Sequence, residues 1–156
     1  MSRLLSSRFL SIIFGLIITT TLSLYSLPAL AATGLTNGLL APCPSSPNCV
    51  VSQDGDAEHM VEPISYQGDR QEVKEALLKV LSVVPRTEVI ENSDNYIRTE
   101  STSRIFKFVD DAEFYFPEEE SVIQVRSASR VGESDLGVNR RRIEQIRLAL
   151  ADLLGN

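Results

Sequence analysis

Four strand-like segments follow one another late in this 156-residue chain, and they constrain its fold more than any other feature. The segments span residues 87–92, 96–102, 104–116 and 121–131. Each is rich in β-branched or aromatic residues and ends at a turn signal. The longest connection, residues 117–120, is far shorter than the dozen or so residues that a parallel crossover needs. The segments therefore predict an antiparallel meander.

Two amphipathic helices are expected to flank this meander. The first begins after Asp69, a good N-cap with Glu72 three residues on, and Pro85 ends it. The second spans about residues 136–154, with Ser134 or Asp135 as its cap. A short strand is expected near residues 60–64. The predicted fold class is α+β: a single antiparallel β-meander sheet with two helices packed on one face, in the order β-α-β-β-β-β-α.

The first 31 residues read as a secretory signal peptide. A short basic start precedes an apolar stretch, and Ala29 and Ala31 supply an A-x-A cleavage site. The alternative is an N-terminal membrane anchor that is retained, because the apolar stretch is nearly long enough to span a bilayer. After cleavage we expect no stable membrane span. Residues 32–42 then form a linker, and residues 43–156 form a single α+β domain.

Cys43 and Cys49 are the two cysteines of the chain. In an exported protein an isolated pair is most simply a disulfide, and we expect one here. A redox dithiol is the alternative, although redox pairs favour two intervening residues at a helix start. The chain has one histidine, His59, so a zinc site built on several histidines is excluded. We expect neither a metal nor a cofactor.

Positive charge is concentrated in residues 126–147, which hold six arginines against three acidic residues. Removal of the signal peptide, with Arg3 and Arg8, would leave 13 basic and 21 acidic residues, a net charge of −8. Such overall acidity argues against nucleic-acid binding, which favours a basic domain. The arginines therefore need a local explanation.

The first explanation is structural: an ion-pair lattice that fixes the sheet and docks the last helix. Asp110 lies in an otherwise apolar row and needs a partner, for which Arg126 or Arg130 on the following strand is expected. Glu144 lies between Arg140 and Arg147 on the helix and can pair with either. The opposite positions of the long strand are expected to face solvent: Ile105, Lys107, Val109, Asp111 and Glu113.

The second explanation is an anion or partner site. Arg140 and Arg142 stand in the first turn of the last helix, where cations are unfavourable unless an anion is present. A glycine-containing turn with Ser134 and Asp135 leads into that turn, and Arg126 or Arg130 would close the site. The expected ligand is a carboxylate, a phosphate, a lipid headgroup or an acidic protein segment.

We therefore expect a non-catalytic binding or accessory protein. One alternative is a hydrolytic enzyme that uses Ser127, Ser129 or Ser134 with His59, although no nucleophile elbow surrounds these serines. Another alternative is an assembly factor for a membrane complex.

Three stretches together carry a family likeness: "LAPCPSSPNCV", "RIFKFVDDAEFYF" and "VIQVRSASRVGESDLGVNRRRIEQIR". In this order they resemble the family named domain of unknown function 1499, over about residues 40–150. The resemblance implies export and a compact α+β domain. It implies no reaction and no catalytic residues. As an exported form of this size without a lipid-anchor cysteine, the chain resembles the cyanobacterial or lumenal members, so the expected compartment is the periplasm or the thylakoid lumen.

Overall fold

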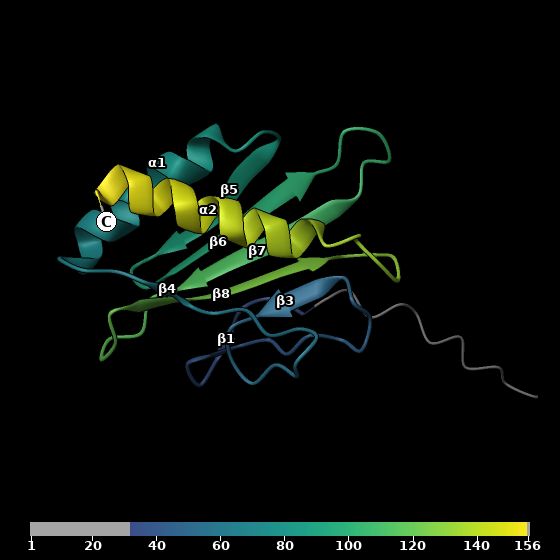
Figure 1. The fold of residues 1–156 in the computed structure, drawn as a ribbon, viewed down its shortest axis with the longest axis horizontal. Coiled ribbons are helices and arrows are strands. Elements are labelled where there is room, and N and C mark those ends of the chain that lie inside the picture. The colour runs from purple at the N-terminus through teal and green to yellow at the C-terminus, as the bar shows by residue number, and fades with distance from the viewer. Residues whose placement is uncertain (1–31, 156) are drawn as a thin grey trace, which may run out of the picture.

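The computed structural model describes residues 32–155, and the expected signal peptide, residues 1–31, lies outside them. One antiparallel sheet forms the centre (Figure 1). Its strands run in the spatial order β3 (Cys49–Val51), β8 (Val122–Ser129), β7 (Val109–Tyr115), β6 (Tyr96–Thr102) and β5 (Thr87–Ser93). The short β4 (Ile64–Ser65) also pairs with β8. The predicted meander of four strands is confirmed as β5 to β8.

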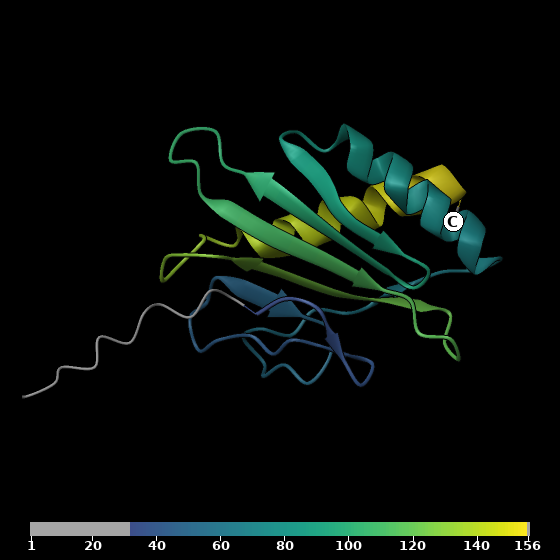
Figure 2. The same ribbon diagram turned by 180° about the vertical axis from the view of Figure 1, so that it is seen from behind.

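Two helices, α1 (Arg70–Val83) and α2 (Val138–Leu154), cover one face of this sheet (Figures 1 and 2). The predicted α+β class is therefore confirmed. Asp69 caps α1, because its carboxylate accepts hydrogen bonds from the backbone N–H groups of Gln71 and Glu72. The buried stripes of both helices pack on apolar side chains of β6, β7 and β8 to form the main core.

The last helix begins later than its pattern predicts. Leu136, expected on the apolar face of this helix, instead precedes it and is 84% exposed. Gly137 is the N-cap residue, with a left-handed φ of 75°. The Asp135 carboxylate accepts from the backbone N–H groups of Gly137 and Asn139, so it satisfies donors at the helix start.

The second face of the sheet is covered by the N-terminal part of the domain. Residues expected as a linker instead form a hairpin of β1 (Leu35–Thr36) and β2 (Leu39–Leu40). Leu40, Val51 and Tyr96 form a small apolar cluster on this side. The expectation that Asp111 and Glu113 face solvent is wrong, because both are buried. The predicted disulfide, Cys43–Cys49, closes the loop before β3 and is confirmed.

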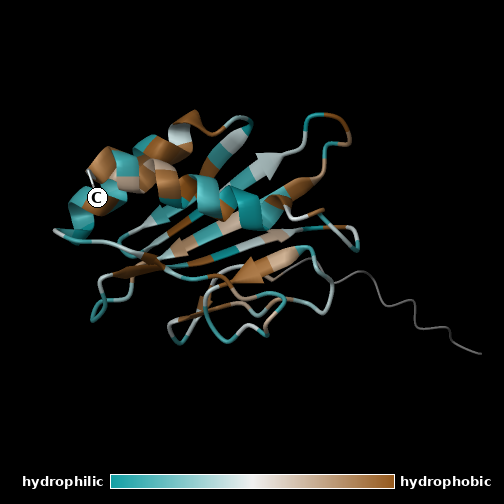
Figure 3. Cartoon of the chain, viewed as in Figure 1, coloured by the Kyte–Doolittle hydropathy of each residue, from teal (hydrophilic) through white to brown (hydrophobic). Residues whose placement is uncertain are grey.

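The long strand expected over residues 104–116 is shorter than predicted, because β7 begins only at Val109. Residues 103–108 form a loop instead. Its base is closed by Ser103, whose N–H donates to the Phe108 carbonyl and whose hydroxyl accepts from the Phe108 N–H. Phe106 and Phe108 are therefore exposed rather than buried, and Figure 3 shows the apolar colour of this loop between β6 and β7.

The two edges of the sheet differ. At one edge, β3 is covered by the chain around residues 59–61, which exchanges backbone hydrogen bonds with Val51. At the other edge, β5 lies open, and its pairing with β6 is interrupted by a register shift between Val89 and Glu91. Within residues 32–155, neither helix combines the length and the apolar character that crossing a membrane requires.

Candidate anion-binding site

The six arginines of residues 126–147 lie on both sides of the sheet. Arg126 of β8, and Arg130 directly after its end, project onto the face that the N-terminal hairpin covers, as their pairings with Glu113 and Asp111 show. The other four lie on α2, above the opposite face. The sheet therefore separates the strand arginines from the helix arginines, and the four expected members of one site do not come together.

Arg126 and Glu113 form an ion pair that is fully buried. The Arg126 Nη1 donates to Glu113 Oε2 at 2.9 Å, and both side chains have no exposed surface. The Tyr96 hydroxyl donates to Glu113 Oε1 at 2.7 Å, and the Gly34 N–H donates to the same oxygen. Burial and the neighbouring Glu113 carboxylate raise the pKa of Tyr96 far above its ordinary value. These contacts join the sheet to its N-terminal cover.

Beside the Arg126–Glu113 pair, Arg130 and Arg98 both bind the carboxylates of Glu100 and Asp111. Arg130 Nε donates to Asp111 Oδ2 at 2.7 Å and Arg130 Nη2 donates to Glu100, while Arg98 Nη1 donates to Asp111 Oδ1 at 3.0 Å. The hydrogen bonds that Arg130 donates to Asp111 raise the pKa of Arg130 above its ordinary value, because they favour the charged form. Arg126 and Arg130 are thus engaged in ion pairs that hold strands together.

Asp110 pairs with the helix and not with the expected strand arginines. Asp110 lies opposite Ser129 of β8. Opposite residues of an antiparallel pair project to the same face, so neither Arg126 nor Arg130 can reach Asp110. The partner is Arg142, whose Nη2 donates to Asp110 Oδ2 at 2.6 Å. Arg142 Nη1 also donates to Ser127 and Asn139.

Arg140 and Arg147 lie on the other edge of α2, as their spacing predicts, and they bind backbone. Arg140 donates to the carbonyls of Glu58 and Met60. Arg147 donates to the carbonyls of Glu62 and Pro63 and to the Glu144 carboxylate. Both side chains attach α2 to the segment that leads into β4, so Arg140 lies away from Arg142.

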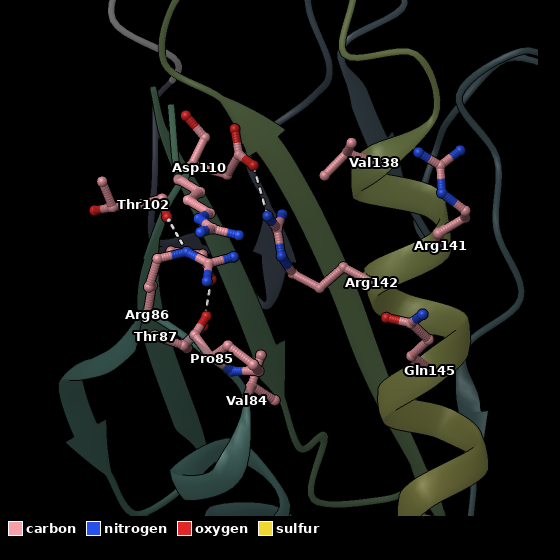
Figure 4. Close-up of a pocket in the computed structure, with 13 residues that line it drawn as sticks. Val84, Pro85, Arg86, Thr87, Thr102, Asp110, Val138, Arg141, Arg142 and Gln145 are labelled. Atoms are coloured by element: carbon pink, nitrogen blue, oxygen red, sulfur yellow. Dashed lines mark hydrogen bonds and ion pairs between the residues drawn. The ribbon is translucent and has the colours of Figure 1, made fainter. Parts of the chain in front are cut away.

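A different group of arginines lines a pocket at the start of α2; the side chains of Arg86 and Arg142 point toward each other, and that of Arg141 points away from them (Figure 4). The pocket has a volume of about 430 Å³ and lies between the start of α2, the end of α1 and the adjoining ends of β5 and β6. Its charged lining residues are Arg86, Arg104, Arg141, Arg142 and Asp110. Hydroxyl groups from both strand ends complete its polar wall: Thr87, Ser101, Thr102 and Ser103.

Three of these guanidinium groups have no carboxylate partner among residues 32–155: those of Arg86, Arg104 and Arg141. Arg86 Nε donates to the Thr102 carbonyl at 3.0 Å, and Arg141 Nη1 donates to the Leu136 carbonyl at 2.8 Å. These bonds orient two of the side chains but leave their positive charges uncompensated. The pocket therefore carries an excess of positive charge in an acidic chain.

Two residues at the pocket and beside it, Arg86 and Gly137, have left-handed backbone conformations. Arg86 has a φ of 56°, a left-handed conformation that non-glycine residues adopt rarely. At Gly137, a Cβ atom would lie 3.1 Å from Arg141 Nη1, so glycine leaves room for that guanidinium. Strained backbone of this kind is found most often at functional sites.

Sequence reasoning found part of this pocket. Arg142 belongs to it, whereas Arg126, Arg130 and Arg140 do not. Ser134 and Asp135 lie in the turn before α2, where Ser134 accepts from the Leu136 N–H. Arg86 and Arg104 were missed. The predicted meander could have placed Arg86 and Arg104 together, because alternate strand connections lie at the same end of an antiparallel sheet.

The serine–histidine pair weighed from the sequence does not lie in the pocket. None of its lining residues is a histidine or a cysteine, and its carboxylate, Asp110, is paired with Arg142. His59 makes its hydrogen bonds with Asp56 and the Ser46 carbonyl, and Ser127 is fully buried. The serine–histidine arrangement weighed from the sequence is therefore not assembled in residues 32–155.

Comparison with known proteins agrees with this picture of a site without an assigned reaction. No curated protein matches the sequence. A family model described as "Protein of unknown function (DUF1499)" matches residues 39–150, which include every strand of the main sheet and most of both helices. The chain therefore belongs to the family of unknown function DUF1499.

Proposed function

We propose that this protein is an exported, non-catalytic protein that binds a small anion in the pocket at the start of α2. The observation that carries the proposal is the grouping of Arg86, Arg104 and Arg141 around one pocket without carboxylate partners in the described chain. In a net acidic protein, glutamates and aspartates are abundant enough to pair every arginine. Arginines left unpaired around one cavity favour an external anion.

The chemistry of the pocket favours a carboxylate or a phosphate. Guanidinium groups present planar, forked donors that match both anions. Arg142 is held in place by Asp110, Ser127 and Asn139, so little side-chain entropy would be lost when it contacts a ligand. The neighbouring hydroxyls of Thr87 and Ser101 lie 2.7 Å apart, so one donates to the other and the second hydroxyl can donate to a ligand oxygen.

Export is supported by the Cys43–Cys49 disulfide, because disulfides persist in oxidising compartments and are rare in the cytosol. The signal-peptide pattern of the first 31 residues supports the same conclusion.

An acidic segment of a partner protein presents the same carboxylates as a free anion. A role in assembling a membrane complex is thus compatible with the same pocket.

Thermal unfolding with inorganic phosphate tests the proposal, with chloride at matched ionic strength as the control. A ligand that binds only the folded state stabilises it by about 2.7 kcal/mol at a hundredfold excess over Kd. We expect phosphate to raise the midpoint in the wild type and not in R86A/R141A. The matched control is R70A/K79A, which removes two positive charges from α1 outside the pocket. An equal phosphate effect in R86A/R141A and the wild type would remove the pocket from consideration.

A further inference from the structure

We infer that the end of the molecule that carries this pocket binds the surface of an anionic membrane. The loop 103–108 enters the interfacial region, and the pocket holds a lipid phosphate. This inference rests on the proposed anion site and names the source of its ligand.

The loop 103–108 exposes an unusual amount of apolar surface. Ile105 is 78% exposed, Phe106 is 73% exposed and Phe108 is 50% exposed. These three side chains lie within four consecutive residues, at the tip of a connection that projects beyond the sheet (Figure 1). Scattered exposed apolar residues need no explanation, but a contiguous group marks an interaction surface.

A second connection at the same end adds to this surface. Val131 and Leu136, between β8 and α2, and Val138, the first residue of α2, are exposed. The two connections are close, because Arg104 and Val138 line the same pocket and the Arg130 N–H donates to the Val109 carbonyl. Both loops lie at one end of the sheet in opposite views (Figures 1 and 2). The apolar residues thus lie on connections next to the anion pocket, which Val138 lines.

Positive charges are interleaved with these apolar residues. Arg104 and Lys107 alternate with Ile105, Phe106 and Phe108 in the sequence of the loop. Long basic side chains can keep their charges at the headgroup level while apolar neighbours enter the acyl boundary. Anionic membranes attract surfaces that combine basic and apolar side chains. The composition therefore favours a lipid surface.

The loop is preorganised for such contact. Ser103 and Phe108 close its base with two backbone-directed hydrogen bonds, of 2.8 and 2.9 Å. The rings of Phe106 and Phe108 stack with centroids 5.6 Å apart. Lys107 between them has a left-handed φ of 57°, as does Leu136 on the second connection with 53°. The rings are therefore presented together to solvent.

The overall acidity of the chain does not oppose this binding. Charges separated by more than a Debye length, about 8 Å at physiological ionic strength, are largely screened. Local charges therefore decide the interaction. Glu133 is an exposed carboxylate on the second connection, while Asp135 accepts hydrogen bonds from Gly137 and Asn139. Against Glu133 stand the basic residues of this end: Arg86, Arg104, Lys107 and Arg141.

Vesicle flotation tests the inference, using phosphatidylcholine vesicles and vesicles of an equal mixture of phosphatidylcholine and phosphatidylglycerol. We expect the wild type to bind the anionic vesicles and to dissociate from them as salt is raised. F106S/F108S should bind them about tenfold more weakly, since the apolar contribution is lost. The matched control L148S/L153S, which changes two exposed leucines of α2, should bind as the wild type does.

The same variants separate this inference from the proposed function. F106S/F108S should keep the phosphate-induced thermal shift, because neither phenylalanine lines the pocket. A phosphate shift without vesicle binding would overturn the membrane inference and leave the anion site standing. Vesicle binding that is unchanged in R86A/R141A, with no phosphate shift in the wild type, would overturn the proposed function. The inference would also be overturned if F106S/F108S bound the anionic vesicles as well as the wild type does, or if the wild type bound neutral and anionic vesicles equally. Binding of the protein to an acidic protein but not to vesicles would overturn it as well.

Discussion

Arg126 and Glu113 face each other across β8 and β7 as a fully buried ion pair, with Nη1 and Oε2 2.9 Å apart. Glu113 accepts further hydrogen bonds from the Tyr96 hydroxyl and the Gly34 N–H. Arg126 is less fully satisfied, since its Nε and Nη2 have no hydrogen-bond partner among residues 32–155. The pair holds together two strands and the segment that covers them.

Removing one partner of this pair should be costly. We expect R126M to lower the free energy of unfolding by about 3 kcal/mol, because it leaves Glu113 charged and buried. The double variant R126M/E113L should lose less than the sum of the two single variants. Urea unfolding of the four proteins measures this coupling. Additive losses would show that the pair does not interact in solution.

Arg142 and Arg141 are neighbours in sequence, yet their substitutions should differ. R142A leaves the nearly buried Asp110 without its partner, and we expect a loss of about 3 kcal/mol in unfolding free energy. R141A removes an exposed side chain and should change the free energy by no more than about 0.5 kcal/mol. Chemical denaturation at neutral pH compares the two. A large loss in R141A would assign that residue to the fold and not to the pocket.

His59 should make stability depend on pH. Burial opposes its charge, but the Asp56 carboxylate at Nδ1 and the Ser46 carbonyl at Nε2 raise its pKa above the ordinary value. Both ring nitrogens face acceptors, so the doubly protonated ring satisfies both.

A raised folded-state pKa stabilises the protein fully below the unfolded value of about 6.5. That stabilisation is lost as the pH rises through the folded pKa. We expect the unfolding free energy of the wild type to fall in this range relative to that of H59Q. Parallel pH profiles of the two proteins would contradict the assignment.

The disulfide should contribute modestly. Cross-linking Cys43 and Cys49, six positions apart, closes a small loop, for which the chain-entropy model gives about 2 kcal/mol. C43S/C49S should therefore remain folded but unfold at a lower urea concentration. Wild type treated with a reductant should match it. Hydrogen exchange should show the largest increase around β3, which begins at Cys49. Loss of the whole fold would show that the loop contributes more than its entropy.

The helices and the meander were predictable because their signals are local. Asp69 and the apolar spacing of residues 73–84 identify α1, and short connections require antiparallel pairing. Even the register of β7 and β8 was within reach, with Asp110 opposite Ser129. The predicted ion pair of Asp110 with Arg126 or Arg130 was wrong, because side chains alternate along a strand and both arginines project to the face opposite Ser129. Arg142, thirty-two positions away, is a tertiary contact.

Other features could not be read from local pattern. The alternation of residues 104–116 is typical of one long strand, yet Ser103 closes a loop that exposes Phe106. Glu113 is buried in contact with the N-terminal segment, where the N–H of Gly34, 79 positions earlier, donates to its carboxylate. Arg86 and Arg104 join the pocket only through the placement of both connections at one end of the sheet.

The open edge at β5 has a consequence for association between copies of the chain. An exposed edge strand is a template for pairing with another molecule, and β5 carries Val89 and Ile90 on its surface. The register shift between Val89 and Glu91 distorts that edge, and Glu88 and Glu91 add charge to it. A second copy would have to pair with an irregular, acidic strand. Polymerisation through this edge is thereby disfavoured.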